Sequence, residues 1–458
     1  MTTLDTQNAQ LDSVNPATGA VVGTVDVTPV EAIPAMVERA RAAGEAFAAL
    51  PPNERIDALL GLADQLKRRR EELASLITAE MGKPTAEALG EVDWVAGACE
   101  KKFADMRAGL TPDHLEDGAT VTDIHFDPYG VAAVITPWNF PLGMPNATVV
   151  PALAAGNAVL LKPSEETPLI GDLFARILQE QLPEGLVQIV HGDEAQGKAL
   201  VAADVDLVVF TGSQAAGRHI LTACGNGLKR VILELGGKDP LIVLNDADLD
   251  KAAQFAVENS FRNCGQVCVS TERIYVVDEV ADSFEEKVIE RTLGLTVGDG
   301  SDEGTDVGPM VNERQKTHVL SQIASAKANG ATVRCGGESL EGNWITPTVI
   351  TGLDGGMDIM TEETFGPVAC IQRVADAEAA LKAANDTPFG LGGCVFGEAE
   401  AESVARRMTA GMIGINRGCG GASGAPFVGA RQSGYGFHGG PLGIRQFTQA
   451  RVVSRPKA

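Results

Sequence analysis

Apolar side chains along this chain follow two patterns, one typical of amphipathic helices and one typical of buried strands. Across residues 53–79 they recur at helical spacing, which predicts a single helix whose basic run at 67–70 faces solvent. Short apolar runs then alternate with helical stretches at intervals of about 20–30 residues, as in βαβ units with a parallel sheet. The runs lie at 131–135, 159–161, 187–190, 207–210, 231–233 and 241–244. This is the composition of a dinucleotide-binding α/β domain.

A second α/β segment follows, with strand-like runs at 273–277, 349–350 and 368–371. Two stretches stand apart from both segments. Residues 118–133 alternate like an exposed hairpin that interrupts the first segment, and residues 446–454 are typical of a terminal strand. Because exposed edge strands need a partner, we expect the chain to associate with itself as a homodimer or homotetramer.

Composition narrows the class of protein. A chain of 458 residues is too long for one core, so about two or three domains are expected. The net charge of −24 argues against nucleic acid and anionic membranes as partners. No apolar stretch approaches the roughly 20 residues of a membrane span, and the first residues do not resemble a signal peptide. The eight cysteines lack the spacing of a disulfide framework or a metal site, which favours a reducing cytoplasm.

Three short segments carry the candidate chemistry. Glu234 lies in Leu-Glu-Leu-Gly-Gly-Lys at 233–238, and Cys268 ends Asn-Cys-Gly-Gln-Val-Cys at 263–268. A thiolate attacks an aldehyde carbonyl, and a carboxylate can then activate a water against the resulting thioester. Asn139, in Thr-Pro-Trp-Asn-Phe-Pro at 136–141, offers an amide for the developing oxyanion. Taken alone, each residue also fits a structural role, as a buried thiol, an ion-pair partner or a turn residue.

These segments, in this order and together with Asn-Pro-Ala-Thr-Gly at 15–19, resemble the aldehyde dehydrogenase superfamily over nearly the whole chain. The resemblance implies an α/β fold with a Rossmann-type NAD-binding domain (residues 1–117 and 134–236). It also implies an α/β catalytic domain (237–429) and a small β oligomerisation arm (118–133 and 430–458). Cys268 is then the nucleophile, Glu234 the general base, and Asn139 the oxyanion donor beside the backbone N–H of Cys268. Relatives that acylate coenzyme A generally lack this Glu, so we expect the thioester to go to water.

The resemblance also implies a set of cofactor-binding residues. Lys162 and Glu165 would bind the adenine-side ribose, where a carboxylate accepts from the 2′-OH and repels a 2′-phosphate. We therefore expect NAD, with NADP as the alternative. Gly212 and Ser213 open a helix whose N–H groups suit a pyrophosphate, in a segment that lacks the Lys of a Walker A loop. Glu363 would hold the nicotinamide ribose. The full set is Thr136, Pro137, Trp138, Lys162, Ser164, Glu165, Gly212, Ser213, Leu235, Glu363 and Phe365; no metal is expected.

The resemblance implies a small-molecule aldehyde as the substrate, and its identity stays open. The expected pocket residues are Phe140, Arg262, Val267, Val269 and Phe427. Succinate-semialdehyde dehydrogenases are similar to this chain and clamp a distal carboxylate with two Arg. One matches Arg262, but the other falls at about Ala147, so a succinate-semialdehyde-specific enzyme is one alternative and Arg262 as an ion-pair partner is the other.

Further alternatives concern the class of protein and a second thiol. A thioesterase or esterase would use the same thiol and acid, but the nucleotide-binding segments argue against it. A structural protein on this scaffold, like the lens crystallins, is opposed by the joint presence of the three catalytic candidates. Cys264 is expected to line the pocket, with a disulfide to Cys268 as the alternative. Late in the chain, Val428 and Arg431 replace a Gly and a Lys of the family pattern, which leaves the loop path near the substrate mouth open.

Overall fold

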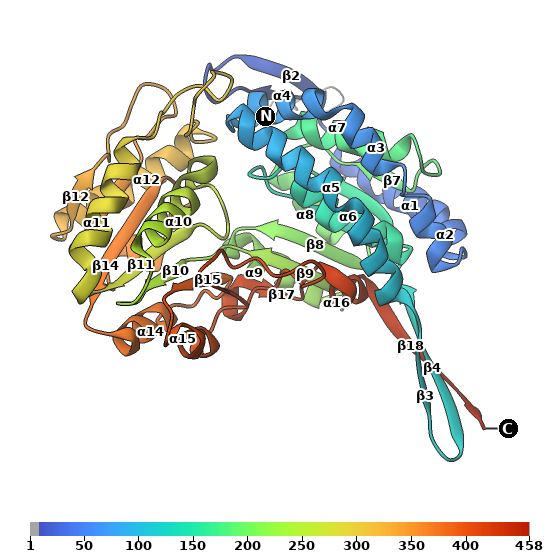
Figure 1. The fold of residues 1–458 in the computed structure, drawn as a ribbon. Coiled ribbons are helices and arrows are strands. Elements are labelled where there is room, and N and C mark those ends of the chain that lie inside the picture. Colours follow the sequence, from blue (N-terminus) through green and yellow to red (C-terminus); the bar gives the residue numbers. More distant parts are fainter. Residues whose placement is uncertain (1–8, 458) are drawn as a thin grey trace.

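The computed structural model describes residues 9–457, which form two α/β lobes and a projecting β arm (Figure 1). The first lobe, mostly blue to green, holds a six-stranded sheet in the order β17-β9-β8-β5-β6-β7. Its strands are parallel except that β17 runs antiparallel to β9. They are β5 (Val131–Ile135), β6 (Ala158–Lys162), β7 (Val187–Ile189), β8 (Leu207–Gly212), β9 (Arg230–Leu235) and β17 (Gly434–Tyr435).

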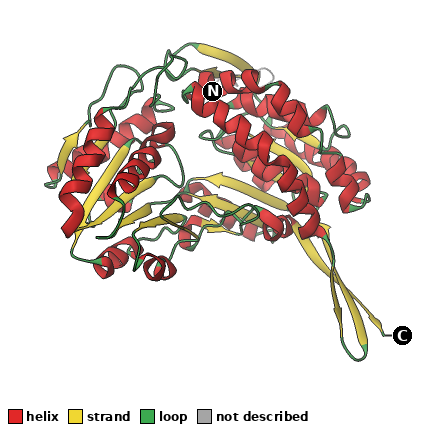
Figure 2. Ribbon diagram, in the orientation of Figure 1, coloured by secondary structure: helices red, strands yellow, loops and turns green. Residues whose placement is uncertain are grey.

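The helices of this lobe pack around the strands (Figure 2), so central strands such as β6 are buried along their whole length. Burial on both faces explains why these strands are continuous apolar runs instead of alternating ones. The helices are α1 (Ile33–Ala48), α2 (Pro52–Asp57), α3 (Leu62–Arg68), α4 (Arg70–Met81), α5 (Thr85–Leu110), α6 (Gly143–Ala155), α7 (Pro168–Gln179), α8 (Glu194–Ala202), α9 (Gln214–Gly225) and α16 (Gly440–Ile444). A separate antiparallel pair joins β1 (Gln10–Val14) to β2 (Val21–Asp26).

The second lobe holds a seven-stranded sheet in the order β12-β13-β14-β11-β10-β15-β16, with only β12 antiparallel to its neighbour. Its strands are β10 (Asp239–Val243), β11 (Thr271–Val277), β12 (Thr332–Cys335), β13 (Thr348–Thr351), β14 (Val368–Val374), β15 (Gly392–Phe396) and β16 (Met412–Ile415). Its helices are α10 (Leu249–Phe261), α11 (Asp278–Leu293), α12 (Glu313–Ala328), α13 (Asp358–Thr361), α14 (Ala377–Asn385) and α15 (Ala401–Arg407). The predicted α/β fold is confirmed.

The arm is a three-stranded antiparallel sheet that projects from the first lobe (Figure 1). A hairpin of β3 (Asp113–Glu116) and β4 (Thr120–Pro128) pairs with β18 (Thr448–Pro456), which runs along the whole of β4. The hairpin lies earlier than residues 118–133, because the Asp117 carboxylate accepts from the N–H groups of Ala119 and Thr120, both at 2.8 Å, and fixes the turn there.

The single helix predicted over residues 53–79 is wrong, since the segment contains α2, α3 and α4. The breaks let α2 pack against α6 while α3 packs against α5 and α7, which one straight helix could not do. The basic run is also more than a solvated face. Arg69 forms an ion pair with Glu180, and Arg70 forms one with Asp93.

Three strands bear on the expected limits of the segments, and two of them, β3 and β17, lie in sheets other than those expected. The run at 241–244 corresponds to β10, which pairs with β11 and β15 in the second lobe. Strand β3 belongs to the arm although it precedes residue 118, and β17 joins the first lobe although it follows residue 430. In each case backbone pairing with a distant segment, which local composition does not record, decides the sheet. The domain limits themselves stay a prediction.

Among residues 9–457, every helix is too short or too polar to span a bilayer.

Candidate active site

The first lobe has one position where its connections reverse direction. From β5 the chain passes to β6 and β7 on one side of the sheet, then returns to β8 and β9 on the other. Ligands of open α/β sheets bind at such a switch point, outside the carboxyl ends of the strands. The segment that leaves β5 here contains Thr136 and Asn139. Strand register brings Lys162 and Phe210 to the same edge, since both pair with Ile135.

A cavity of about 400 Å³ opens at this edge and extends between the two lobes. It is lined by all three candidate catalytic residues, by all eleven candidate cofactor residues, and by Phe140. Residues far apart in the sequence therefore meet at one place, which the separate sequence segments could not establish. The catalytic and cofactor roles of these residues stay predictions at this point.

Cys268 lies in a loop between the 3-10 turn Arg262–Gly265 and β11. Asn263, Cys264 and Gly265 all have positive φ, at 52°, 57° and 70°. A Cβ on residue 265 would lie 2.0 Å from the Gly366 carbonyl oxygen, so only glycine fits this approach of the two backbones. The strained path is a feature of functional loops, and here it turns Cys268 into the cavity.

Gln266 holds this loop in place. Its amide donates to the Asn263 carbonyl at 3.0 Å, and its side-chain oxygen accepts from the Val311 N–H at 2.8 Å. The Gln266 carbonyl accepts from the Asn139 side-chain nitrogen at 3.0 Å, which ties the loop to the segment after β5. An amide nitrogen carries two N–H groups, so Asn139 keeps one for a group in the cavity. Lys83 fixes the backbone at the same place by donating to the Asn139 carbonyl at 2.9 Å.

Glu234 sits near the end of β9, in register with Thr211 on β8. Only 2% of its surface is exposed, and neither carboxylate oxygen has a hydrogen-bond partner in the described part of the chain. Burial raises the pKa of Glu234 well above its usual range. An unpaired carboxyl whose proton affinity is raised, in a cavity beside a thiol, has the properties of a general base.

The surroundings of the Cys268 thiol in the free protein oppose its ionisation. Burial raises its pKa, and the charges of Asp239, Glu363 and Glu234 raise it further. The positive surroundings that normally activate a cysteine are therefore not supplied by the protein alone. Ionisation of the Cys268 thiol therefore requires either a group that accepts its proton or the positive charge of a bound ligand.

The wall opposite the first sheet is the segment 363–365. Glu272 accepts from the N–H groups of Thr364 and Phe365, both at 2.8 Å, and pairs with buried Lys238 at 2.6 Å. Glu363 in turn accepts from the Gly237 N–H at 3.0 Å. Phe365 meets the Trp138 ring edge-on with ring centres 5.5 Å apart. This network positions a carboxylate and an aromatic ring inside the cavity.

At the other end of the cavity, the Lys162 ammonium lies 3.7 Å from the Glu165 carboxylate. The Lys162 side chain is buried, and burial lowers its pKa, whereas the Glu165 side chain is 42% exposed. Ser213 caps α9 by accepting from the Ala216 N–H at 3.3 Å. Its neighbour Gly212 ends β8. A cation, a carboxylate and the start of a twelve-residue helix thus share one wall.

Four of the five expected pocket residues do not line this cavity. Val267 is buried within the loop itself, and the Val269 carbonyl accepts from the Asn259 side-chain nitrogen. Phe427 stacks on the His438 ring with centres 5.3 Å apart. Arg262 is exposed, forms no ion pair within residues 9–457, and lies 5.7 Å from the centre of the Phe140 ring. The alternative, in which Arg262 forms an ion pair, is therefore not seen in the described part of the chain.

Cys264 is also outside the cavity. It is buried, and its sulfur contacts Met310 at 3.5 Å. Burial raises the pKa of the Cys264 thiol. The left-handed backbone at 263–265 removes the helical spacing that would have put Cys264 and Cys268 on one face.

The sequence reasoning missed part of the cavity wall. Arg314, Gln315 and His318 extend into it from the first turns of α12. Gln315 donates to the carbonyls of Thr364 and Phe365, at 3.1 and 3.2 Å, so it also supports the opposite wall. An Asn before this helix signals where it starts, but not which cavity it faces. The remaining unpredicted lining residues are Ile135, Met144, Phe210, Thr211 and Gly236.

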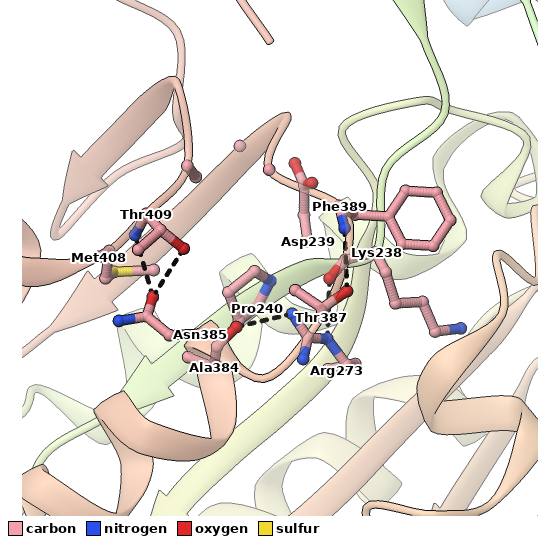
Figure 3. Close-up of a pocket in the computed structure, with 13 residues that line it drawn as sticks. Lys238, Asp239, Pro240, Arg273, Ala384, Asn385, Thr387, Phe389, Met408 and Thr409 are labelled. Carbon is pink, nitrogen blue, oxygen red and sulfur yellow. Dashed lines mark hydrogen bonds between the residues drawn. The ribbon is translucent and has the colours of Figure 1, made fainter. Parts of the chain in front are cut away.

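A second cavity beside Lys238 and Asp239 holds only about 10 Å³ (Figure 3). Arg273 crosses it and donates to the carbonyls of Lys238 and Ala384, at 2.8 and 3.0 Å. Such a volume takes a single water at most, so it is no substrate site. Its contribution is electrostatic, because Asp239, whose pKa is raised to about 7 by burial, is one of the charges acting on Cys268.

Comparisons with known proteins converge on one group. The model of the aldehyde dehydrogenase family matches residues 3–453. Succinate-semialdehyde dehydrogenase (NADP(+)) GabD of Escherichia coli strain K12 is 36% identical, over 98% of this chain and 95% of its own. The peroxisomal aminoaldehyde dehydrogenase 2 of Pisum sativum is 35% identical, over 98% and 93%. The crystal structure of betaine aldehyde dehydrogenase from Staphylococcus aureus with NAD+ has a TM-score of 0.94 and 31% identity, over 97% and 91%.

Proposed function

The chain belongs to the aldehyde dehydrogenase family and oxidises an aldehyde to a carboxylic acid with NAD(P), and we propose that Cys268, Glu234 and Asn139 carry out this reaction. One observation supports the assignment above all. The thiol and the unpaired carboxyl line one cavity, whose other walls carry the residues expected to bind the cofactor. Because Glu234 is in place, the thioester is passed to water.

The cavity suits a dinucleotide. Its walls supply the Lys162 ammonium, the start of α9 and the Glu363 carboxylate along one continuous space. The hydroxyls of Thr136 and Thr211 are buried there without a hydrogen-bond partner in the described chain, so they are free to bind a ligand. When bound, NAD(P) supplies a hydride acceptor.

The protein's own groups act in order. The Cys268 sulfur adds to the aldehyde carbon, and the thiol proton passes to solvent. The free N–H of Asn139, with the backbone N–H of Cys268, stabilises the negative oxygen that forms. After hydride loss Cys268 carries a thioester. Glu234 then takes a proton from a water, which attacks the thioester carbon and releases the acid and the thiol.

NAD is the preferred cofactor in this proposal. Glu165 lies beside Lys162 on the cavity wall, where it can accept from a ribose 2′-OH. A 2′-phosphate would bring like charge against it. Since the Glu165 side chain is 42% exposed, solvent screens the repulsion and the preference is moderate.

The enzyme works as a homo-oligomer in which the arm pairs with another copy of the chain. Strand β18 has one free edge in the sheet order β18-β4-β3, and its Val452 is 64% exposed. Such an edge is an open template for another strand. Sedimentation of the full chain tests the assembly, since a chain that stays monomeric when residues 448–457 are intact contradicts it.

We place the protein in the cytoplasm because all eight cysteines are free.

The activity is tested with a panel of aldehydes. Purified protein is mixed with NAD and with butanal, benzaldehyde or succinate semialdehyde, and NADH absorbance is followed. The proposal expects NADH and the matching acid in equal amounts from at least one aldehyde. Ester hydrolysis with no NADH from any aldehyde would instead favour the thioesterase alternative.

A further inference from the structure

A buried ion pair lies against the segment that carries the oxyanion donor. The Lys83 ammonium and the Glu91 carboxylate are 2.5 Å apart, and each side chain is only 1% exposed. Glu91 lies on α5, and Lys83 comes just before the start of this helix. A buried ion pair adds little net stability over apolar side chains of similar size, because both charges lose their hydration. What such a pair supplies instead is a fixed position for the groups that it bonds.

Glu91 fixes the start of α6, which packs against α5 (Figure 1). One of its oxygens accepts from the N–H groups of Leu142 and Gly143, at 3.0 and 2.8 Å. The first N–H groups of a helix have no partner within it, and a polar side chain at the N-cap usually binds them. The N-cap residue of α6 is Leu142, whose side chain cannot do so. A carboxylate from the neighbouring helix takes this role, and it thereby holds the chain just after Asn139.

Lys83 fixes Asn139 itself. Besides its bond to the Asn139 carbonyl, its ammonium lies 4.0 Å from the centre of the Phe140 ring. The Asn139 side chain is bonded on its other side to the Gln266 carbonyl. With the backbone held by a charged donor and the side chain held by the nucleophile loop, the remaining amide N–H keeps one direction.

Glu87 holds the nucleophile loop from the same face of α5, one turn before Glu91. Its carboxylate oxygens accept from the Asn263 N–H at 3.0 and 3.2 Å. Asn263 has a φ of 52°, which residues other than glycine adopt only when their surroundings hold them there. The Asn263 side chain also donates to the Asn139 carbonyl, at 3.1 Å. One helix therefore fixes both the oxyanion-donor segment and the loop that ends in Cys268.

We propose that Lys83, Glu87 and Glu91, which we call the α5 anchor, are positioning residues that set the Asn139 amide and the Cys268 N–H at the right separation for one oxyanion. The inference rests on the proposed function of these two donors. The α5 anchor is not among the cavity-lining residues of the described chain, so it acts through the backbone groups that it bonds. Oxyanion donors are effective only when they are already in place, and a misplacement of about 1 Å costs on the order of 10²-fold in rate.

The test is a double-mutant cycle between Lys83 and Asn139. Lys83→Met removes the donor to the Asn139 carbonyl and should lower kcat by about 10–100-fold, with the KM for NAD unchanged. In an Asn139→Ala background the same substitution should lower kcat by less than about twofold, because the group that it positions is already gone. A structural role elsewhere in the fold would give the same loss in both backgrounds.

Two further proteins guard against a loss of folding. Lys83→Met leaves the Glu91 charge buried without its partner, so the cycle is repeated with Lys83→Met/Glu91→Gln, which removes both charges. The Gln oxygen still accepts from the N–H groups at the start of α6, and the loss of kcat should remain. Lys229→Met is the matched control. Lys229 also donates to a backbone carbonyl, that of Val201 at 2.7 Å, but it lies between α9 and β9, and kcat should not change.

Glu87 gives an independent readout, because its side chain is only half-buried and tolerates replacement. Glu87→Leu cannot accept from the Asn263 N–H and should lower kcat by about tenfold, whereas Glu87→Gln can accept and should keep most of the activity.

The proposal is overturned if the double variant Lys83→Met/Glu91→Gln keeps the wild-type kcat, or if its loss is equal with and without Asn139. It is also overturned if Glu87→Leu keeps the wild-type kcat. Failure of the proposed function is a separate outcome, seen when Asn139→Ala alone leaves kcat unchanged or the wild type oxidises no aldehyde.

Discussion

Replacing Glu234 by Gln separates the two halves of the proposed reaction. The side chain keeps its size, and no hydrogen bond is lost, because neither Glu234 oxygen has a partner in the described chain. Gln cannot take a proton from water, so the thioester on Cys268 accumulates. We expect kcat to fall by about 10²–10⁴, the usual contribution of a general base, while hydride transfer in the first turnover stays close to the wild-type rate.

The assay is rapid mixing of Glu234→Gln with NAD and a saturating aldehyde. The expected trace is a burst of about one NADH per active site, followed by slow turnover. Wild-type protein, in which deacylation is not blocked, is the control. A rate loss of similar size without a burst would refute the reasoning, because it would place Glu234 in thiol activation instead of deacylation.

The same variant gives a stability readout with a fixed sign. The pKa of Glu234 in the folded protein is raised by burial above its ordinary 4.5, so the folded state holds the proton more tightly than the unfolded chain. The stability this confers is present below pH 4.5 and is lost as pH rises through the raised pKa, by about 1.4 kcal/mol per pH unit. Gln does not titrate. The Tm of Glu234→Gln relative to wild type should therefore increase above pH 4.5 and then level off. A difference that does not change with pH contradicts this.

Three other substitutions test the remaining roles. Cys268→Ala should abolish aldehyde oxidation and ester hydrolysis together, since no covalent intermediate forms; loss of one with retention of the other, measured on the same preparation, contradicts a shared nucleophile. Asn139→Ala should lower kcat by about 10²–10³, the usual loss for one oxyanion donor, and a change in KM alone would make Asn139 a binding or turn residue. Glu165→Ser should shift kcat/KM from NAD towards NADP, and the assignment of Glu165 to the 2′-OH fails if the wild type already prefers NADP or the ratio does not move.

The sequence predicts the first sheet well because its strands are buried on both faces and therefore appear as unbroken apolar runs. It fails where long-range pairing decides. Strand β17 has only two residues, and its place beside β9 comes from the path of a distant loop. The helix predicted over 53–79 keeps one hydrophobic period across breaks that serve packing against α5, α6 and α7.

The site shows the same division. Segments such as 136–141 and 233–238 carry their chemistry in consecutive residues, so they are visible in the sequence, and the structure brings them into one cavity. Gln315 and His318 act through backbone carbonyls of the segment 363–365. A contact with a backbone atom leaves no pattern of residue types, so no sequence signal identifies it.

The central claim is that Cys268 carries the acyl group and that Glu234 lets water remove it. The most direct measurement is intact-mass and peptide mass spectrometry of Glu234→Gln after reaction with NAD and aldehyde. The account predicts a mass increase equal to one acyl group per chain, located on the peptide that contains Cys268 and lost on treatment with hydroxylamine. An unmodified chain after a completed NADH burst, or an acyl group on Cys264 instead of Cys268, would contradict it.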